Sequence, residues 1–177
     1  MKRLRHILQS KHLIKIITII IFIITLLYTN YYPFKSKYTK NDKEFIGIVT
    51  KYEVKEDKIT VNKPIGRNPK DRLKMAVVKD GKNAITHFEV IKRYENFTHM
   101  KARLETGRTH QIRVHALSIN HPLLGDEVYG PKNNKFKLKG QTLHAKKLGF
   151  IHPTTKEYVE FDSELPKYFQ DILNKLK

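Results

Sequence analysis

Two runs of alternating apolar and polar residues restrict the fold more than any other feature of this chain. AITHFEVIKRYE (84–95) and HMKARLET (99–106) both alternate, and this spacing places one face of each run in a core and the other in water. The pattern predicts two long antiparallel strands joined near Asn96-Phe97. Gly107 ends the second strand.

The residues that follow have helical rather than strand spacing. THQIRVHALSIN (109–120) places Ile112, Ala116 and Ile119 on one side, with Val114 and Leu117 adjoining. Thr109 is a suitable N-cap because its hydroxyl can accept a hydrogen bond from a free N–H of the first turn. A strand, a glycine turn and a short helix are therefore expected in direct succession.

The other segments are expected to add strands and one more helix. FIGIVTKYEV (45–54) and the residues after it predict a hairpin around Glu56-Asp57. Three further elements are predicted: a basic loop leading to a short strand (65–78), a hairpin from 143–153 and 156–166 with Pro153 at its turn, and a terminal amphipathic helix (168–177). The predicted fold class is α+β, with a mostly antiparallel mixed β-sheet and few helices.

Residues 1–42 differ in composition from the rest and form a basic leader with an apolar segment. Residues 16–34 carry no charge over nineteen positions, which makes them a candidate transmembrane helix by length and hydropathy. The same stretch is made almost wholly of residue types that AT-rich DNA encodes in nearly any frame, so non-homologous sequence is the competing interpretation. A domain boundary is expected at residues 42–43.

The charge of the chain favours a polyanionic partner. The net charge is +18, and residues 44–177 hold 26 Lys or Arg against 16 Asp or Glu. The region expected to fold is therefore basic in its own right, which is typical of proteins that bind nucleic acid or an anionic membrane surface. There is no cysteine, which excludes disulfides and thiolate metal sites.

The histidines and the nucleophile motifs do not indicate a metal site or a hydrolase. His110 and His115 are five residues apart, so their side chains diverge on a helix. No carboxylate stands at metal-ligand spacing beside them, and the chain has no G-x-S-x-G motif. We therefore expect no metal site.

Two arginines flank the start of the predicted helix and differ in what they can reach. Arg108 stands at the strand-to-helix turn, where a planar guanidinium beside a helix N-terminus suits a carboxylate or a phosphate. Arg113 faces elsewhere, toward the backbone of a bound strand or toward a structural carboxylate. Asp126 is interpreted as a residue that fixes its loop.

LETGRTHQIRVHALSINHPLLGDEVYG (104–130) resembles the RNA pseudouridine synthases of the RluA/RluD type. That family carries L-x-T-G-R-T/S-H-Q-I/L-R-V-H, then H-P-I/L, then G-D-x-x-Y-G. The segments NKPIGRNPKDRLKMAVVKDGKNAITHFEVI (62–91) and LHAKKLGFIHPTTKEYVEFDSELP (143–166) are also similar to family stretches. The resemblance covers about residues 43–177, which are expected to be the C-terminal portion of the catalytic domain.

The resemblance implies a reaction and two site residues. Members of the family flip a uridine of ribosomal or transfer RNA out of its stack and isomerise it to pseudouridine, without a cofactor. An arginine of the G-R-T-H-Q motif pairs with the catalytic aspartate, and this role falls on Arg108. A tyrosine of a K-x-Y motif stacks on the target base, and Phe45 occupies that position. The expected RNA-binding residues are Arg67, Arg72, Lys74, Thr109, His110, Gln111, Arg113 and His115.

The family's aspartate lies in an H-R-L-D-x-x-T-S-G segment, and no such string occurs in this sequence. The expectation is therefore a truncated and inactive pseudouridine synthase, monomeric and cytoplasmic, with RNA as its partner. Two alternatives stay open. One is a non-catalytic RNA-binding remnant, tethered to a membrane if 16–34 spans one. The other is a small basic membrane protein in which the likeness no longer carries meaning.

Overall fold

A computed structural model gives the fold and describes residues 42–50, 53–131 and 136–176. The chain divides into two compact units, one of Asn41–Gly149 with Val159–Lys177 and one of Met1–Lys40 with Phe150–Tyr158. Of the second unit, only residues 150–158 are described. The apolar segment 16–34, predicted to be helical, lies outside the described residues.

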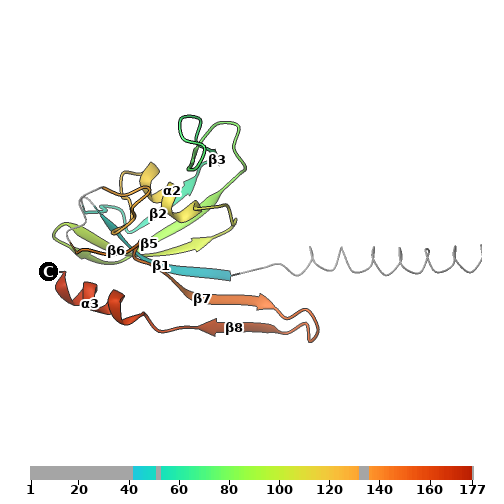
Figure 1. The fold of residues 1–177 in the computed structure, drawn as a ribbon. Helices are drawn as coiled ribbons and strands as arrows, with labels where there is room; N and C mark the ends of the chain where they lie inside the picture. The colour runs from blue at the N-terminus through green and yellow to red at the C-terminus, as the bar shows by residue number, and fades with distance from the viewer. Residues whose placement is uncertain (1–41, 51–52, 132–135, 177) are drawn as a thin grey trace, which may run out of the picture. The chain divides into compact units, whose positions relative to one another are not determined.

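Six strands of the described part form one sheet, in the order β2-β5-β6-β1-β7-β8, and β3 pairs with β4 in a second sheet (Figure 1). The strands are β1 (Asp42–Thr50), β2 (Lys58–Asn62), β3 (Ile65–Arg67), β4 (Met75–Val77), β5 (Ile85–Tyr94), β6 (Phe97–Leu104), β7 (Leu143–Ile151) and β8 (Tyr158–Asp162). The helices are α2 (Gln111–Ser118) and α3 (Lys167–Lys175). The α+β class with mostly antiparallel pairing is confirmed.

The two alternating runs form the strands that the sequence predicts. β5 and β6 are antiparallel neighbours, with Thr86 opposite Leu104 and Phe88 opposite Ala102. Phe88 and Ala102 are buried, because residues directly opposite each other on neighbouring strands point to the same face of the sheet, and here that face meets the core. The connection between the strands is as short as predicted.

The hairpin predicted around Glu56-Asp57 is wrong. β1 pairs with β6 and β7, whereas β2 pairs with β5, so two strands separate β1 from β2. Val54 explains the crossing: it is fully buried, its N–H donates to Thr98 Oγ1 at 3.2 Å, and its carbonyl accepts from Arg93 Nε at 2.8 Å. These contacts with β5 and β6 carry the connection across to the far side of the pair, and local alternation contains no information about them.

The helix predicted after Gly107 is present and packs as expected. α2 buries Ile112 and Ala116 in the main core cluster, which also contains Phe88 and Ala102, and the partly buried Ile119 packs against that cluster. Val114 belongs to a separate cluster with Ile65, Ala84 and Tyr129. The helix therefore rests on the sheet and also contacts the β3–β4 pair.

The start of the helix differs from the prediction. The N-cap residue is His110 and not Thr109, and no side chain caps the first turn. His110 has a left-handed backbone conformation (φ 55, ψ 21), which delays the first helical residue to Gln111. Side-chain hydrogen bonds of Gln111 hold the preceding turn in place of a hydroxyl cap.

The C-terminal elements also match their sequence patterns. The hairpin of β7 and β8 has its turn at residues 152–157, where the His152 N–H donates to the Glu157 carbonyl at 2.8 Å and Pro153 occupies the turn. α3 buries Phe169 and Ile172 in a cluster with Leu124. Within the described part of the chain, α2 and α3 are the only α-helices, and neither is long and apolar enough to cross a membrane.

His99 of β6 is a buried group that should make the stability of the protein depend on pH. Its side chain lies against the ring of Phe169, with 5.9 Å between ring centroids, and its Nε2 has no hydrogen-bond partner among the described residues. Burial lowers the pKa of His99 from 6.5 to about 4. The unfolded chain therefore takes up this proton first, and stability falls as the pH drops from 6.5 toward 4.

Between pH 7 and about 4, we expect the free energy of unfolding to fall by roughly 2–3 kcal/mol less in His99→Leu than in the wild type, because leucine has no ionisable group. Urea unfolding at a series of pH values between 7 and about 4 measures it. His144→Gln, at a half-buried position on β7, is the control and should keep the wild-type slope. An unchanged slope in His99→Leu would contradict the assignment.

Candidate functional site

The candidate site is built around the turn that joins β6 to α2. Arg108 lies in this turn and is half-buried, with its Nε donating to the backbone carbonyl of Asn83 at 2.8 Å. None of the ion pairs among the described residues includes Arg108. The guanidinium is thus oriented by the backbone and makes no ion pair with a described carboxylate.

Gln111 holds the turn with all the hydrogen-bonding capacity of its carboxamide. Its Oε1 accepts from the Arg108 N–H and from the Thr106 hydroxyl, both at 2.9 Å. Its Nε2 donates to the Ile85 carbonyl at 2.9 Å and to Thr86 Oγ1 at 3.0 Å. The side chain is buried, so each of these bonds satisfies a group that would otherwise be costly to bury. One amide therefore ties the Arg108 backbone to β5 and to the end of β6.

The network continues from Gln111 into the core. Thr86 Oγ1 lies 2.9 Å from Nδ1 of His115, and Nε2 of His115 lies 2.9 Å from the Lys63 carbonyl. A carbonyl only accepts, so Nε2 carries the proton, and the Thr86 hydroxyl donates to Nδ1. Burial lowers the pKa of His115 and, with the nearby Lys63 charge, outweighs the hydrogen bond to the Lys63 carbonyl. His115 is therefore a neutral, structural histidine.

Arg113 is held by a carboxylate, one of the two partners expected from the sequence. Its Nε and Nη2 donate to the two oxygens of Asp126 at 2.7 Å each. Oδ1 of Asp126 also accepts the N–H groups of Val128 and Tyr129, at 3.0 and 2.9 Å. Burial by itself would raise the pKa of Asp126, but the hydrogen bonds from Arg113, Tyr129 and Val128 more than offset it, and the net pKa is lowered. Asp126 fixes its loop, as predicted.

The loop after Asp126 connects the helix to the β3–β4 pair through Tyr129. The Tyr129 hydroxyl accepts the Met75 N–H at 2.9 Å and lies 2.9 Å from Nδ1 of His110. The guanidinium of Arg113 stands over the Tyr129 ring, 4.8 Å from its centroid, a favourable cation–π arrangement. One buried tyrosine therefore sets the position of the His110 turn relative to β4.

Several of the predicted RNA-binding residues lie in or beside the β3–β4 hairpin. Arg67 ends β3 and its Nη1 donates to the Arg72 carbonyl at 3.2 Å. Lys74 precedes β4, and its Nζ is 3.3 Å from Asp71. Partial burial lowers the pKa of His110, and the charges of Arg113 and Arg67 lower it further. The hairpin thus presents cations beside a neutral His110.

Phe45 lies on β1, opposite Ala102 of β6 and Ala145 of β7. It is half-buried and packs against the main core cluster, which includes Ile112 of α2. Phe45 and α2 are therefore on the same face of the sheet.

Gln111 and His115 differ from the role that the sequence suggested for them. Both were expected to bind RNA, but both are buried and fully bonded within the protein, which leaves them to support the site from inside. Thr86, Asn83 and Tyr129 hold neighbouring site residues and were missed. A threonine in the buried register of an alternating strand was the signal available for Thr86, whereas nothing local distinguishes Asn83, which acts through its carbonyl.

A family model described as RNA pseudouridylate synthase matches residues 26–118 of this chain. The chain belongs to this family. The matched segment contains the Arg108 turn and all of α2, while the Asp126 loop and the β7–β8 hairpin lie beyond it. The family that was predicted from the motif in residues 104–118 is thus confirmed.

Curated relatives extend the similarity. An uncharacterized RNA pseudouridine synthase, YlyB of Bacillus subtilis, is 50% identical over 124 residues, covering 70% of this chain and 41% of that protein. The ribosomal large subunit pseudouridine synthase D of Pasteurella multocida is 45% identical over 129 residues, covering 66% of this chain and 40% of that protein. The chain thus spans about two fifths of the length of these relatives.

Solved structures share the fold. Human RNA pseudouridylate synthase domain containing 1 aligns with a TM-score of 0.65 at 23% identity, covering 82% of this chain and 68% of that one. Human RNA pseudouridylate synthase domain containing 4 aligns with a TM-score of 0.59 at 22% identity, covering 78% and 64%. At this level of identity the comparison shows the pseudouridine synthase fold alone.

Gln111→Ala should destabilise the protein by about 2–4 kcal/mol, because it removes four hydrogen bonds of a buried carboxamide, among them those to the half-buried Ile85 carbonyl and the buried Thr86 hydroxyl. Urea denaturation measures the difference. Gln170→Ala is the matched control: Gln170 is exposed and its side chain donates to the Leu165 carbonyl. The loss of this exposed bond should cost less than about 1 kcal/mol. Equal effects of the two substitutions would contradict the role given to Gln111.

Asp126→Asn should cost about 3 kcal/mol at pH 7, because it leaves the Arg113 guanidinium without its buried counter-charge. The folded pKa of Asp126 lies below 3.8, so the wild-type protein keeps this contribution above that pH and loses it as the pH falls further. The free energies of unfolding of the two proteins, measured with urea at pH 7 and in acid, should therefore become more alike as the pH falls below 3.8. A difference in free energy of unfolding that stays constant with pH would contradict this, because it would show that the charge of Asp126 is not the cause of the destabilisation.

Proposed function

We propose that residues 43–177 form the C-terminal portion of a pseudouridine synthase catalytic domain that binds ribosomal or transfer RNA beside Arg108, with residues 1–42 as a separate region. The observation that carries this proposal is the buried Gln111–Thr86–His115 network. It holds the Arg108 turn against β5 and β6 with no side-chain donor or acceptor of Gln111 to spare. Such preorganisation is expected at a site that must present a charge in a fixed direction.

In this proposal, the exposed cations and polar groups around the turn bind the RNA. Arg67 and Arg72 are exposed, Lys74 is half-buried, and Thr109 and His110 are exposed in the turn itself. Guanidinium and ammonium groups make most of the contacts that neutralise phosphates. Gln111 and His115 position these groups, and Arg113 does so through its bond to Asp126.

We further propose that this 177-residue chain does not isomerise uridine by itself. The family's H-R-L-D-x-x-T-S-G string is absent from its sequence, and Arg108 makes no ion pair with a carboxylate of the described residues. Arg108 would occupy the place of the arginine that pairs with the aspartate. Phe45 would occupy that of the base-stacking tyrosine, keeping the ring face without the hydroxyl. The loss of such a catalytic group removes several orders of magnitude in rate.

RNA binding is tested with a fluorescein-labelled single-stranded RNA by anisotropy at several salt concentrations. Arg108→Ala should weaken binding about tenfold and reduce the salt slope by about one. Arg103→Ala is the matched control, because Arg103 is an exposed arginine of β6 between Ala102 and Leu104 and so points to the other face of the sheet. An equal loss of RNA affinity in both variants would show that only the net charge of the protein matters, and it would refute a site at Arg108.

Inactivity is tested by release of tritium from RNA labelled at C5 of uridine. The wild-type chain should release no more tritium than a protein-free blank, because its sequence lacks the segment that carries the family's catalytic aspartate. Release that rises with the amount of protein and disappears in Arg108→Ala would show that the chain is a complete catalyst.

A further inference from the structure

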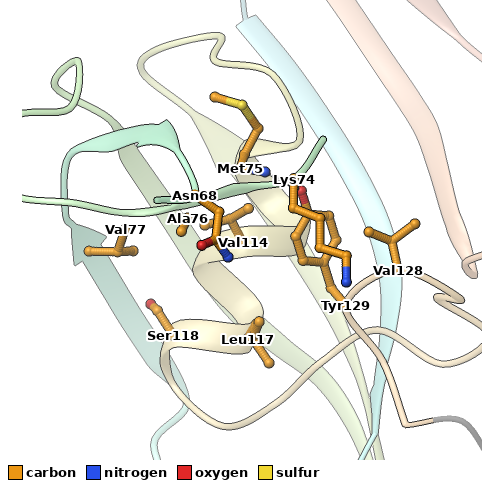
Figure 2. Close-up of a pocket in the computed structure, with 10 residues that line it drawn as sticks. All are labelled: Asn68, Lys74, Met75, Ala76, Val77, Val114, Leu117, Ser118, Val128 and Tyr129. Carbon is orange, nitrogen blue, oxygen red and sulfur yellow. Dashed lines mark hydrogen bonds between the residues drawn. The ribbon is translucent and has the colours of Figure 1, made fainter. Parts of the chain in front are cut away.

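A second site lies on the side of α2 that faces the β3–β4 pair. There the structure has an open pocket of about 390 Å³. It is lined by residues of β4 and the preceding loop, by Val114, Leu117 and Ser118 of α2, and by Val128 and Tyr129 (Figure 2). Arg108 is not among the lining residues. The pocket adjoins the turn discussed above through Tyr129, whose hydroxyl lies 2.9 Å from Nδ1 of His110.

The pocket has an apolar wall that nothing in the described chain covers. Leu117, Val128 and Val77 all line it, with exposed fractions of 42%, 41% and 37%. Figure 2 shows these side chains around the pocket, with Val114 on the helix between them. Three aliphatic side chains from three segments of the chain form a surface suited to a flat, weakly polar group.

Polar groups of the wall still have free hydrogen-bonding capacity. Asn68 uses its Oδ1 to accept the Lys70 N–H at 2.9 Å, and no described residue accepts a bond from its Nδ2. Ser118 donates its hydroxyl hydrogen to the His115 carbonyl at 2.8 Å, which leaves the oxygen as an acceptor. The pocket therefore offers a donor and an acceptor to a ligand that carries both.

The charge at the rim indicates an anionic ligand. Lys74 lines the pocket and its Nζ is 3.3 Å from Asp71. Arg67 and Arg72 of the same hairpin make no ion pair with a described carboxylate, so the net charge of the rim is positive. The wall is also preformed, because the Met75 N–H donates to the Tyr129 hydroxyl and the Tyr129 ring packs under Arg113. A ligand that enters is not required to order these residues, which favours its binding.

We propose that this pocket is a subsite for one unpaired nucleobase of the bound RNA, a nucleotide other than the one presented to Arg108. The base lies against Leu117, Val77 and Val128, a ring carbonyl accepts from Asn68, and the adjoining phosphate meets Lys74. Single-stranded RNA is held in this way by apolar contact with base faces together with backbone cations. The proposal rests on the proposed RNA binding and adds a base-dependent contribution to it.

The test compares two probes of equal backbone length, a 12-residue oligouridylate and the same oligomer with its bases removed. Leu117→Gln removes apolar surface from the pocket without changing charge, and it should weaken the oligouridylate about fivefold while leaving the abasic oligomer unchanged. Leu117→Met should retain wild-type affinity. Leu148→Gln is the matched control, since Leu148 is 39% exposed on β7 and does not line the pocket. It should change neither affinity.

Each result decides the proposal. An unchanged oligouridylate affinity in Leu117→Gln, or an equal loss for both probes, overturns the base subsite while the proposed RNA binding stands. A wild-type chain that binds neither probe overturns the proposed function itself. Crosslinking with 4-thiouridine in the oligomer gives an independent readout: attachment to the peptides of Met75–Val77 or Leu117 supports the subsite, and attachment confined to other peptides refutes it.

Discussion

The carboxamide of Gln111 is the interaction on which the arrangement of this site depends. A buried amide with two acceptor and two donor bonds can be satisfied in only one position relative to its partners, because each bond has a narrow range of distance and angle. Its partners lie on β5, at the end of β6 and in the Arg108 turn. The packing of α2 on the sheet and the direction of Arg108 are therefore set together.

A second constraint connects the helix to the β3–β4 pair. Asp126 neutralises Arg113 and at the same time orders the backbone of its own loop. Tyr129 follows in that loop and reaches both Met75 and His110. Two short polar networks thus position an arginine turn, a cationic hairpin and a preformed pocket around one helix of eight residues. This explains how so small a helix can organise most of the surface proposed to bind RNA.

Much of the fold could be predicted from local pattern. The alternation in 84–106 predicts β5 and β6, the spacing in 109–120 predicts α2, and both are confirmed. The role of Asp126 also followed from its loop. The prediction of a hairpin at Glu56-Asp57 was wrong for a physical reason. Strands that follow each other along the chain need not pair when other strands offer longer pairing, and here β1 pairs with β6 and β7.

The residue types therefore determine which segments become strands or helices, because period and turn chemistry are local properties of the chain. They also determine the family, because the family model matches residues 26–118, which contain the glycine, arginine and glutamine of the turn before α2. Which strand lies beside which, and whether Gln111 points into the core or toward a ligand, was decided only by tertiary packing. Burial and hydrogen-bond satisfaction involve residues far apart in the sequence, such as Asn83 with Arg108 and Met75 with Tyr129.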